Sequence, residues 1–166
     1  MKPLLLGIDI GTSFVKAVLA SPQGCVLAQA QAAYPTHYVQ PGWVEQEPDD
    51  WWQGAVAATR EVLGRVEGGA RRVAGIGVSG QGCAVTLVDA GGRVLHPAII
   101  WMDTRSERQC ERLRQCCATD ILRINGKAPA PYNADPVLMW LQELLPGLID
   151  AAHCSLTTTA YINFRL

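Results

Sequence analysis

The fold is decided near the start of the chain, by the stretch LLLGIDIGTSFVKAVL at Leu4–Leu19. This stretch predicts a buried strand, a tight turn and a second strand. The apolar run that ends at Ile10 carries one charge, Asp9, and a carboxylate is costly in a strand buried on both faces unless something pairs with it. Gly11 follows at once, where a tight turn needs either a positive φ or a close approach of the backbone. We therefore expect a hairpin with an acidic residue beside its turn.

The turn of this hairpin has the composition of a phosphate-binding site. Thr12 and Ser13 offer hydroxyl and backbone N–H groups, which can form an anion-binding concavity, and Asp9 can hold a magnesium ion through water. The P-loop is a different solution, because it needs a helix and a G-x-x-x-x-G-K-[ST] run that this sequence lacks. An ordinary hairpin turn with a surface Asp remains open as the alternative.

Length and composition restrict the classes of protein. A chain of 166 residues with 49% hydrophobic and 17% charged residues can bury the core of one domain. The net charge of −1 and the lack of a basic stripe argue against a nucleic-acid partner. No apolar run approaches the ~20 residues that span a bilayer, and no signal peptide precedes the first strand. We expect a cytoplasmic protein without a membrane partner.

The cysteines do not form a metal-binding or disulfide pattern. No C-x-x-C pair occurs, and the three histidines lie apart from the thiols in sequence, so we expect neither a zinc site nor a disulfide framework. The six cysteines are Cys25, Cys83, Cys110, Cys116, Cys117 and Cys154.

The rest of the chain predicts a mixed α/β fold. Residues 25–32 alternate well enough to form a third strand, which makes an antiparallel meander with the first two. Residues 34–47 have no hydrophobic period and contain two prolines, so we expect a loop in which Trp43 packs on the core. A helix is expected from Pro48 to about Val66. Further strands are expected at 73–80, 84–88, 98–101 and 153–157, and further helices from 103–105 to about 117, from 133 or 135, and at 159–166.

Two segments that follow expected strands carry polar and aromatic groups suited to a sugar or polyol. Ligands of α/β sheets bind beyond the carboxyl ends of strands. Gln81 stands between glycines after one strand, and Trp101, Asp103 and Arg105 follow another. An indole face packs on the C–H groups of a sugar, and the polar side chains bind its hydroxyls. The alternatives are a loop role for Gln81 and a helix N-cap role for Asp103.

Taken together, these segments resemble the N-terminal domain of the FGGY carbohydrate kinases, with the xylulokinase branch the most similar. The resemblance covers the whole chain and implies a ribonuclease H-like fold of the actin, hexokinase and Hsp70 superfamily. It also implies transfer of the ATP γ-phosphoryl group to a sugar or polyol hydroxyl, with magnesium. It rests on the ordered segments Gly7-Ile8-Asp9-Ile10-Gly11-Thr12-Ser13, Trp43-Val44-Glu45-Gln46, Trp51-Trp52, Ile76-Gly77-Val78-Ser79-Gly80-Gln81 and Pro97-Ala98-Ile99-Ile100-Trp101-Met102-Asp103-Thr104-Arg105.

The resemblance also implies roles for particular residues. Asp9 would hold the metal, and the phosphates of ATP would meet Gly11, Thr12, Ser13 and Lys16. The sugar pocket would be lined by Gln81, Gly82, Cys83, Trp101, Asp103 and Tyr132. Xylulokinases carry Met-His where this chain has Gly82-Cys83, so the imidazole that would bind a ketopentose is missing. This departure favours a polyol, L-xylulose or erythritol kinase over a D-xylulose kinase.

The resemblance places the general-base Asp and the adenine-binding glycines beyond Leu166, and residues 161–166 lack a helix cap. We therefore expect residues 1–166 to be an incomplete N-terminal kinase domain, inactive alone and without the second, adenine-binding domain. A homodimer remains possible. Two other classes stay open: a non-catalytic sugar-binding relative, and an actin- or Hsp70-like ATPase that shares only the hairpin.

Overall fold

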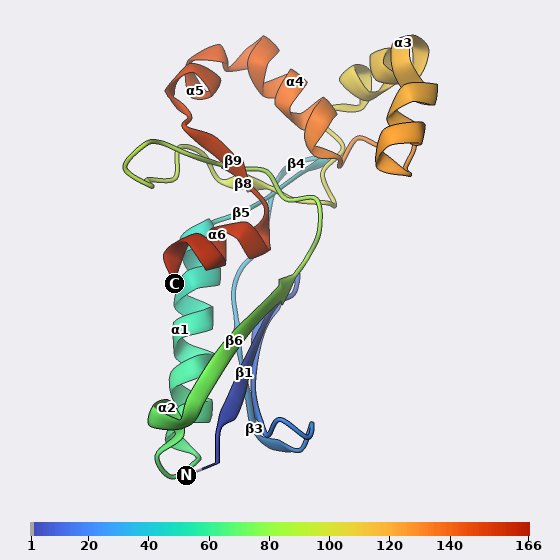
Figure 1. Cartoon of the computed structure of the whole chain (residues 1–166). Helices are drawn as coiled ribbons and strands as arrows, with labels where there is room; N and C mark the ends of the chain where they lie inside the picture. Colours follow the sequence, from blue (N-terminus) through green and yellow to red (C-terminus); the bar gives the residue numbers. More distant parts are fainter. Residues whose placement is uncertain (1) are drawn as a thin grey trace. The chain divides into compact units, whose positions relative to one another are not determined.

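The computed structural model describes residues 2–166, and the chain divides into two compact units. Of the described residues, the first unit contains 2–36, 47–81 and 159–166, and the second contains 37–46 and 82–158. Each unit has its own sheets and helices, most of which are labelled in Figure 1. The two units are described separately below.

The first unit is built on a four-stranded sheet with strand order β3-β2-β1-β6. β1 (Leu4–Ile10), β2 (Phe14–Ala20) and β3 (Val26–Ala33) form the antiparallel meander that the sequence predicts. β6 (Val73–Gly80) lies parallel to β1, which makes the sheet mixed. A short helix, α2 (Gly69–Arg72), leads into β6 and was not expected from the sequence.

One face of this sheet is covered by α1 (Pro48–Gly64), which packs on β2 and β3. The helix begins with Pro48 and two acidic residues in its first turn, as expected from the sequence. Along β1 the residues alternate between buried and exposed, so Leu6 is buried while Leu5 and Asp9 are exposed. The expectation of a strand buried on both faces is therefore wrong: Asp9 lies on the open face, where a carboxylate pays little desolvation cost.

The helix α6 (Thr158–Arg165) joins the first unit through the start of α1. The hydroxyl of Tyr161 donates to a carboxylate oxygen of Asp49 at 2.8 Å, and Arg165 donates to the same oxygen at 2.6 Å. The rings of Trp51 and Tyr161 meet edge to face, with centroids 6.3 Å apart. Buried aromatic rings and a shared acidic residue thus hold the last helix of the chain against α1.

The second unit contains two small sheets and three helices. β4 (His37–Gln40), β5 (Trp43–Gln46) and β8 (Ala98–Ile99) form one sheet in that order, and β7 (Thr86–Val88) pairs with β9 (Cys154–Leu156). The helices are α3 (Glu107–Asn125), α4 (Ala134–Leu144) and α5 (Pro146–Ala151). The buried core of this unit consists of Val85, Leu87, Ile99, Val137, Trp140 and Leu141.

The loop expected at residues 34–47 is a hairpin, and that expectation is wrong. β4 is exposed at all four of its positions, so it shows no alternation, and β5 buries the polar residues Glu45 and Gln46. The turn between the strands is made possible by Gly42, whose φ of 81° lies in the left-handed region. Because β5 buries polar residues, a rule based on the alternation of apolar and polar residues does not predict this strand.

The boundaries of other elements also differ from the expectation. The strands expected at 84–88 and 98–101 are shorter, and a helix from 107 to 125 replaces the shorter one expected to end near 117.

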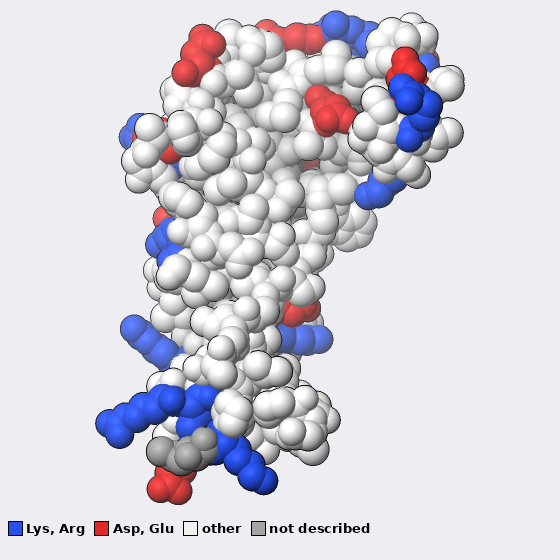
Figure 2. All heavy atoms as spheres, in the orientation of Figure 1, with Lys and Arg blue, Asp and Glu red and all other residues white. Residues whose placement is uncertain are grey.

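Within residues 2–166, none of the helices is both long and apolar enough to cross a membrane. On the face drawn in Figure 2, basic and acidic side chains are scattered between large uncharged areas.

Candidate functional site

The turn between β1 and β2 is tight because its glycine approaches the opposite backbone closely. The N–H of Gly11 donates to the carbonyl oxygen of Phe14 at 3.1 Å. A Cβ atom at Gly11 would lie 3.2 Å from that same oxygen, a close contact that would require the Phe14 carbonyl to shift. A glycine at this turn was expected to provide either a positive φ or a close approach of the backbone. The structure shows the close approach.

Residues that follow β3 hold this turn from the side. The hydroxyl of Tyr34 donates to the carbonyl oxygen of Gly11, and the N–H of Tyr34 donates to the carbonyl oxygen of Ser13 at 3.3 Å. The hydroxyl of Thr36 donates to the carbonyl oxygen of Thr12 at 3.4 Å. Three consecutive carbonyl groups of the turn are thus fixed by a segment more than twenty residues away.

Tyr34 belongs to the candidate site but is not indicated by the sequence, because residues 34–47 show no hydrophobic period and predict a loop. Burial raises the pKa of its hydroxyl, and the negative charge of Asp9 raises this pKa further. The carboxylate of Asp9 therefore acts on the same turn. The register of β3 explains its position, since Ala33 pairs with Phe14 and Tyr34 therefore follows directly beside the turn.

On the open face of the sheet, three polar residues of neighbouring strands share one register position. Asp9 of β1 pairs with Lys16 of β2 on one side and with Ser79 of β6 on the other. A depression of about 430 Å³ lies over them, lined also by Gly7, Val18 and Gly77. A carboxylate, an ammonium group and a hydroxyl thus stand in one row at the bottom of an open depression beside the turn.

This row fits a magnesium ion held through water. Among residues 2–166 there is no group of three or more His, Cys, Asp or Glu residues that could enclose a metal ion. Magnesium, however, keeps several water ligands and is commonly bound through one or two carboxylates together with phosphate oxygens. Asp9 is exposed beside open space, which is the arrangement that such water-mediated binding requires.

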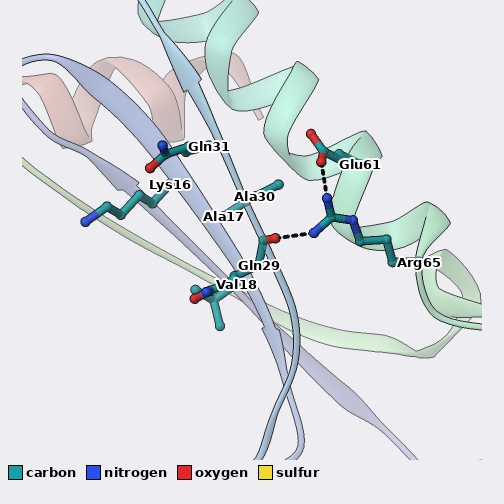
Figure 3. Close-up of a pocket in the computed structure, with 8 residues that line it drawn as sticks. All are labelled: Lys16, Ala17, Val18, Gln29, Ala30, Gln31, Glu61 and Arg65. Carbon is teal, nitrogen blue, oxygen red and sulfur yellow. Dashed lines mark hydrogen bonds and ion pairs between the residues drawn. The ribbon is translucent and has the colours of Figure 1, made fainter.

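A larger hollow, of about 530 Å³, lies by β3 and the end of α1 and contains an internal ion pair. Arg65 forms an ion pair with Glu61 and donates to the carbonyl oxygen of Gln29 at 2.6 Å. Figure 3 shows that Lys16 extends away from this pair, on the other side of β3. The charged groups of Arg65 and Glu61 in this hollow are therefore paired with each other within the protein.

Beyond β6 the chain passes through the segment expected to meet a sugar. The N–H of Gln81 donates to the carbonyl oxygen of Ile10 at 2.7 Å, which extends the pairing of β6 with β1 by one residue. Gly82 is exposed, and a Cβ atom added there would meet no atom within 4 Å. Cys83 has a φ of 55°, a left-handed conformation that is strained for a residue with a side chain. Such strain is frequent at ligand-binding sites.

Within the second unit, three of the predicted sugar-pocket segments approach one another. The Sγ atom of Cys83 lies 4.0 Å from Oδ1 of Asn133, the neighbour of Tyr132. Val85 and Ile99 exchange backbone hydrogen bonds of 2.9 and 3.2 Å, so the segments that carry Cys83 and Trp101 run side by side. Trp101 is 45% exposed and Tyr132 is 41% exposed. Gln81 belongs to the first unit.

Asp103 is fully buried, and its carboxylate is hydrogen-bonded to groups within the chain. Its carboxylate accepts hydrogen bonds from the N–H of Val44 at 2.6 Å and from the N–H of Arg105 at 2.8 Å. The guanidinium of Arg105 donates to both carboxylate oxygens, at 2.7–3.0 Å. The helix-cap interpretation of Asp103 is wrong, because α3 begins at Glu107 with Ser106 as its N-cap. A sugar hydroxyl would have to compete with these donors.

The side chain of Arg105 is buried at the centre of the same cluster. It pairs with Glu45 at 2.8 Å and lies over the rings of Trp43 and Trp140, 4.0 and 5.1 Å from their centroids. The two indole rings meet edge to face at 5.1 Å. This cluster fixes the loop after β8 against β5 and α4, while Trp101 of the same loop is partly exposed. A rigid loop of this kind can present an aromatic face to a ligand.

Comparison with known proteins identifies the family. Residues 4–166 match the family model described as "FGGY family of carbohydrate kinases, N-terminal domain". The chain is 34% identical over its whole length to the glycerol kinase of Methylobacterium nodulans and 33% identical over 98% of its length to the xylulose kinase of Bacillus subtilis. It superimposes on the crystal structure of xylulose kinase from Rhodospirillum rubrum with a TM-score of 0.93 and 29% identity, over 98% of this chain and 34% of that one.

The chain therefore belongs to the FGGY family of carbohydrate kinases, which confirms the resemblance seen in the sequence. The expected fold class is confirmed with it: a mixed sheet with an antiparallel meander in the ribonuclease H-like fold of actin and hexokinase. The chain spans about a third of the length of these relatives, 34% of the glycerol kinase and 32% of the xylulose kinase.

Proposed function

We propose that this chain supplies the N-terminal part of an enzyme that transfers the γ-phosphoryl group of ATP to a hydroxyl of a small sugar or polyol. The observation that carries the proposal is the family match over residues 4–166, which includes both the hairpin turn and the Trp101 loop. Relatives of similar identity are named glycerol kinase and xylulose kinase. Both names describe phosphorylation of a polyhydroxylated small molecule.

In this proposal the turn between β1 and β2 binds the phosphates of ATP. Gly11, Thr12 and Ser13 form the turn, Lys16 contributes a cation from β2, and Asp9 holds magnesium through water. Catalysis of phosphoryl transfer is mostly positioning and neutralisation of charge, so a rigid turn matters more than a reactive group. The hydrogen bonds from Tyr34 and Thr36 to the turn supply that rigidity.

The substrate contacts in this proposal come from Gln81, Gly82, Cys83, Trp101 and Tyr132. Trp101 and Tyr132 offer exposed aromatic faces, which suit the C–H faces of a polyol. Gly82 and Cys83 supply no imidazole, which favours a polyol such as glycerol or a pentitol over D-xylulose. Asp103 contributes indirectly in this proposal, by fixing the loop that carries Trp101.

We further propose that transfer requires residues beyond those of this chain, since the relatives are about three times as long. No Asp in the chain matches a general-base motif, and phosphoryl transfer in kinases uses a carboxylate to take the hydroxyl proton. A non-catalytic sugar-binding protein of the same family remains the second candidate.

The test uses a chimera in which residues 4–166 replace the matching third of the Bacillus subtilis xylulose kinase. ADP release is measured with Mg-ATP and a panel of glycerol, erythritol, pentitols, D-xylulose and L-xylulose, for the chimera and for the 166-residue chain alone. We expect sugar-dependent ADP from the chimera and none from the chain alone. Activity of the chain alone would place the base within these residues.

Two controls make a negative result informative. A circular dichroism spectrum and a cooperative melt show whether the chimera is folded. Sugar binding to the folded chimera is then measured by calorimetry. A folded chimera that binds a polyol without releasing ADP would favour the non-catalytic alternative.

A further inference from the structure

Two adjacent cysteines lie in the middle of α3, at a break in the helix. Cys117 has φ −151° and ψ 21°, while the residues on both sides are helical. In a regular helix, successive side chains point about 100° apart, so the sulfur atoms of adjacent cysteines diverge. The break turns these two side chains toward each other, and the Sγ atoms of Cys116 and Cys117 lie 2.8 Å apart.

The pair is free and accessible. Both residues are unoxidised thiols; Cys116 is exposed and Cys117 is half-buried. The hydrogen bond between the two sulfur atoms raises the pKa of the Cys117 thiol, with a smaller contribution from burial. A hollow of about 400 Å³ opens beside Cys116 and is lined by Arg112, Gln115 and Met139. Met139, one of the residues that line this hollow, has a thioether, which is also a soft sulfur group.

We propose that Cys116 and Cys117 form a vicinal dithiol site that binds soft, thiophilic centres through both sulfur atoms, with trivalent arsenic as the defining ligand class. Soft metals and metalloids prefer sulfur donors. A second thiol held beside the first makes the second bond intramolecular, which raises the effective concentration and slows release. The other exposed cysteines, Cys25 and Cys154, lie far from this pair in sequence and have no adjacent thiol.

The binding step balances without an oxidant. An organoarsenic oxide, R–As=O, reacts with the two thiols to give a cyclic dithioarsenite, and two As–S bonds replace the two S–H bonds. The two protons leave with the oxygen atom as one water molecule, and arsenic remains trivalent. The step therefore needs nothing that the protein and the reagent do not supply.

The test uses phenylarsine oxide and the 166-residue chain in its native state, followed by intact-protein mass spectrometry. We expect one adduct per chain that survives a large excess of the monothiol glutathione and is removed by the dithiol 2,3-dimercaptopropanol. Cys116→Ser and Cys117→Ser should each lose the glutathione-resistant adduct. The matched variants Cys25→Ser and Cys154→Ser should keep it.

Two results would overturn the proposal. The first is a glutathione-resistant adduct in Cys116→Ser or Cys117→Ser, because a single sulfur would then suffice. The second is a wild-type chain that binds the arsenical only after unfolding in urea, because the sulfur atoms would then diverge in the native helix. Circular dichroism checks that each variant is folded, and none of these measurements depends on kinase activity.

Discussion

At the residue scale, a substitution of Asp103 tests whether its carboxylate stabilises the fold or binds the substrate. Its carboxylate compensates the buried guanidinium of Arg105, and removal of one partner of a buried ion pair costs about 3–5 kcal/mol. We expect Asp103→Ala to lower the free energy of unfolding in urea by this amount. Asp120→Ala, which breaks an exposed pair with Arg123, should cost at most about 1 kcal/mol.

The same variants test the alternative for Asp103. If Asp103→Ala were as stable as the wild type and lost only sugar affinity, its carboxylate would belong to the pocket instead of the buried cluster. Arg105 would then have to be satisfied by Glu45 alone, whose side chain is 12% exposed.

Tyr34 gives a second prediction at this scale. Tyr34→Phe removes the hydroxyl that donates to the Gly11 carbonyl, and the loss of one such hydrogen bond costs about 1 kcal/mol. Tyr38→Phe is the matched control, because Tyr38 is an exposed residue of β4. We expect thermal melts to separate the two variants. In the active chimera, Tyr34→Phe should also raise the KM for ATP, which a purely structural loss elsewhere would not do.

At the element scale, the two faces of β1 make different contributions to stability. Leu6 is 4% exposed beneath α1 and Leu5 is 44% exposed on the open face. Leu6→Ala should therefore cost about 2–5 kcal/mol, as for other buried leucines. Leu5→Ala should cost less than about 1 kcal/mol. Equal losses in urea denaturation would show that the open face is covered in solution.

The contact between α3 and α4 predicts a dependence of stability on pH. Glu143 accepts a hydrogen bond from Gln109 at 2.8 Å and pairs with Arg108 and Arg112. The bond from Gln109, followed by those from the arginines, lowers the pKa of the Glu143 carboxyl below its ordinary value of 4.5. Its stabilising contribution is therefore present above the ordinary pKa and is lost as the pH falls through the lower, folded value.

The variant Glu143→Gln tests this dependence. We expect its melting temperature to lie below that of the wild type near pH 7, with the difference shrinking steadily as the pH falls below about 4. Glu67→Gln, at an exposed position after α1, serves as the control and should follow the wild type throughout. A difference for Glu143→Gln that is constant with pH would contradict the assignment.

At the scale of the whole molecule, the proposed phosphate residues and most of the proposed sugar residues belong to different units. Asp9 and the turn lie in the first unit, whereas Trp101 and Tyr132 lie in the second. In the active chimera, Asp9→Asn should raise the KM for ATP and the magnesium concentration that gives half-maximal activity. The KM for sugar should change little. Trp101→Ala should raise the KM for sugar about tenfold, the value of one aromatic stacking contact, with little change for ATP. Steady-state kinetics with each substrate varied in turn measure both.

Much of the first unit could be predicted from the sequence, because its signals are local. The apolar run of β1, the glycine at the turn and the proline and acids that begin α1 act through neighbouring residues. The hairpin β4–β5 could not be predicted in the same way, since β5 buries Glu45 and Gln46 and β4 buries nothing. The helix expected to end near residue 117 instead continues to Asn125, with a break at Cys117.

The sequence by itself determined the family, the strand meander and the identity of the turn that begins with Gly11, because ordered motifs and local backbone preferences carry that information. Only the tertiary structure decided that Asp9 faces an open depression, that Tyr34 holds the turn and that Asp103 is enclosed by Arg105 and Val44. These facts depend on contacts between segments that lie far apart in the chain. A side chain's neighbours and burial, and hence its chemistry, are set by such contacts and cannot be deduced from local sequence alone.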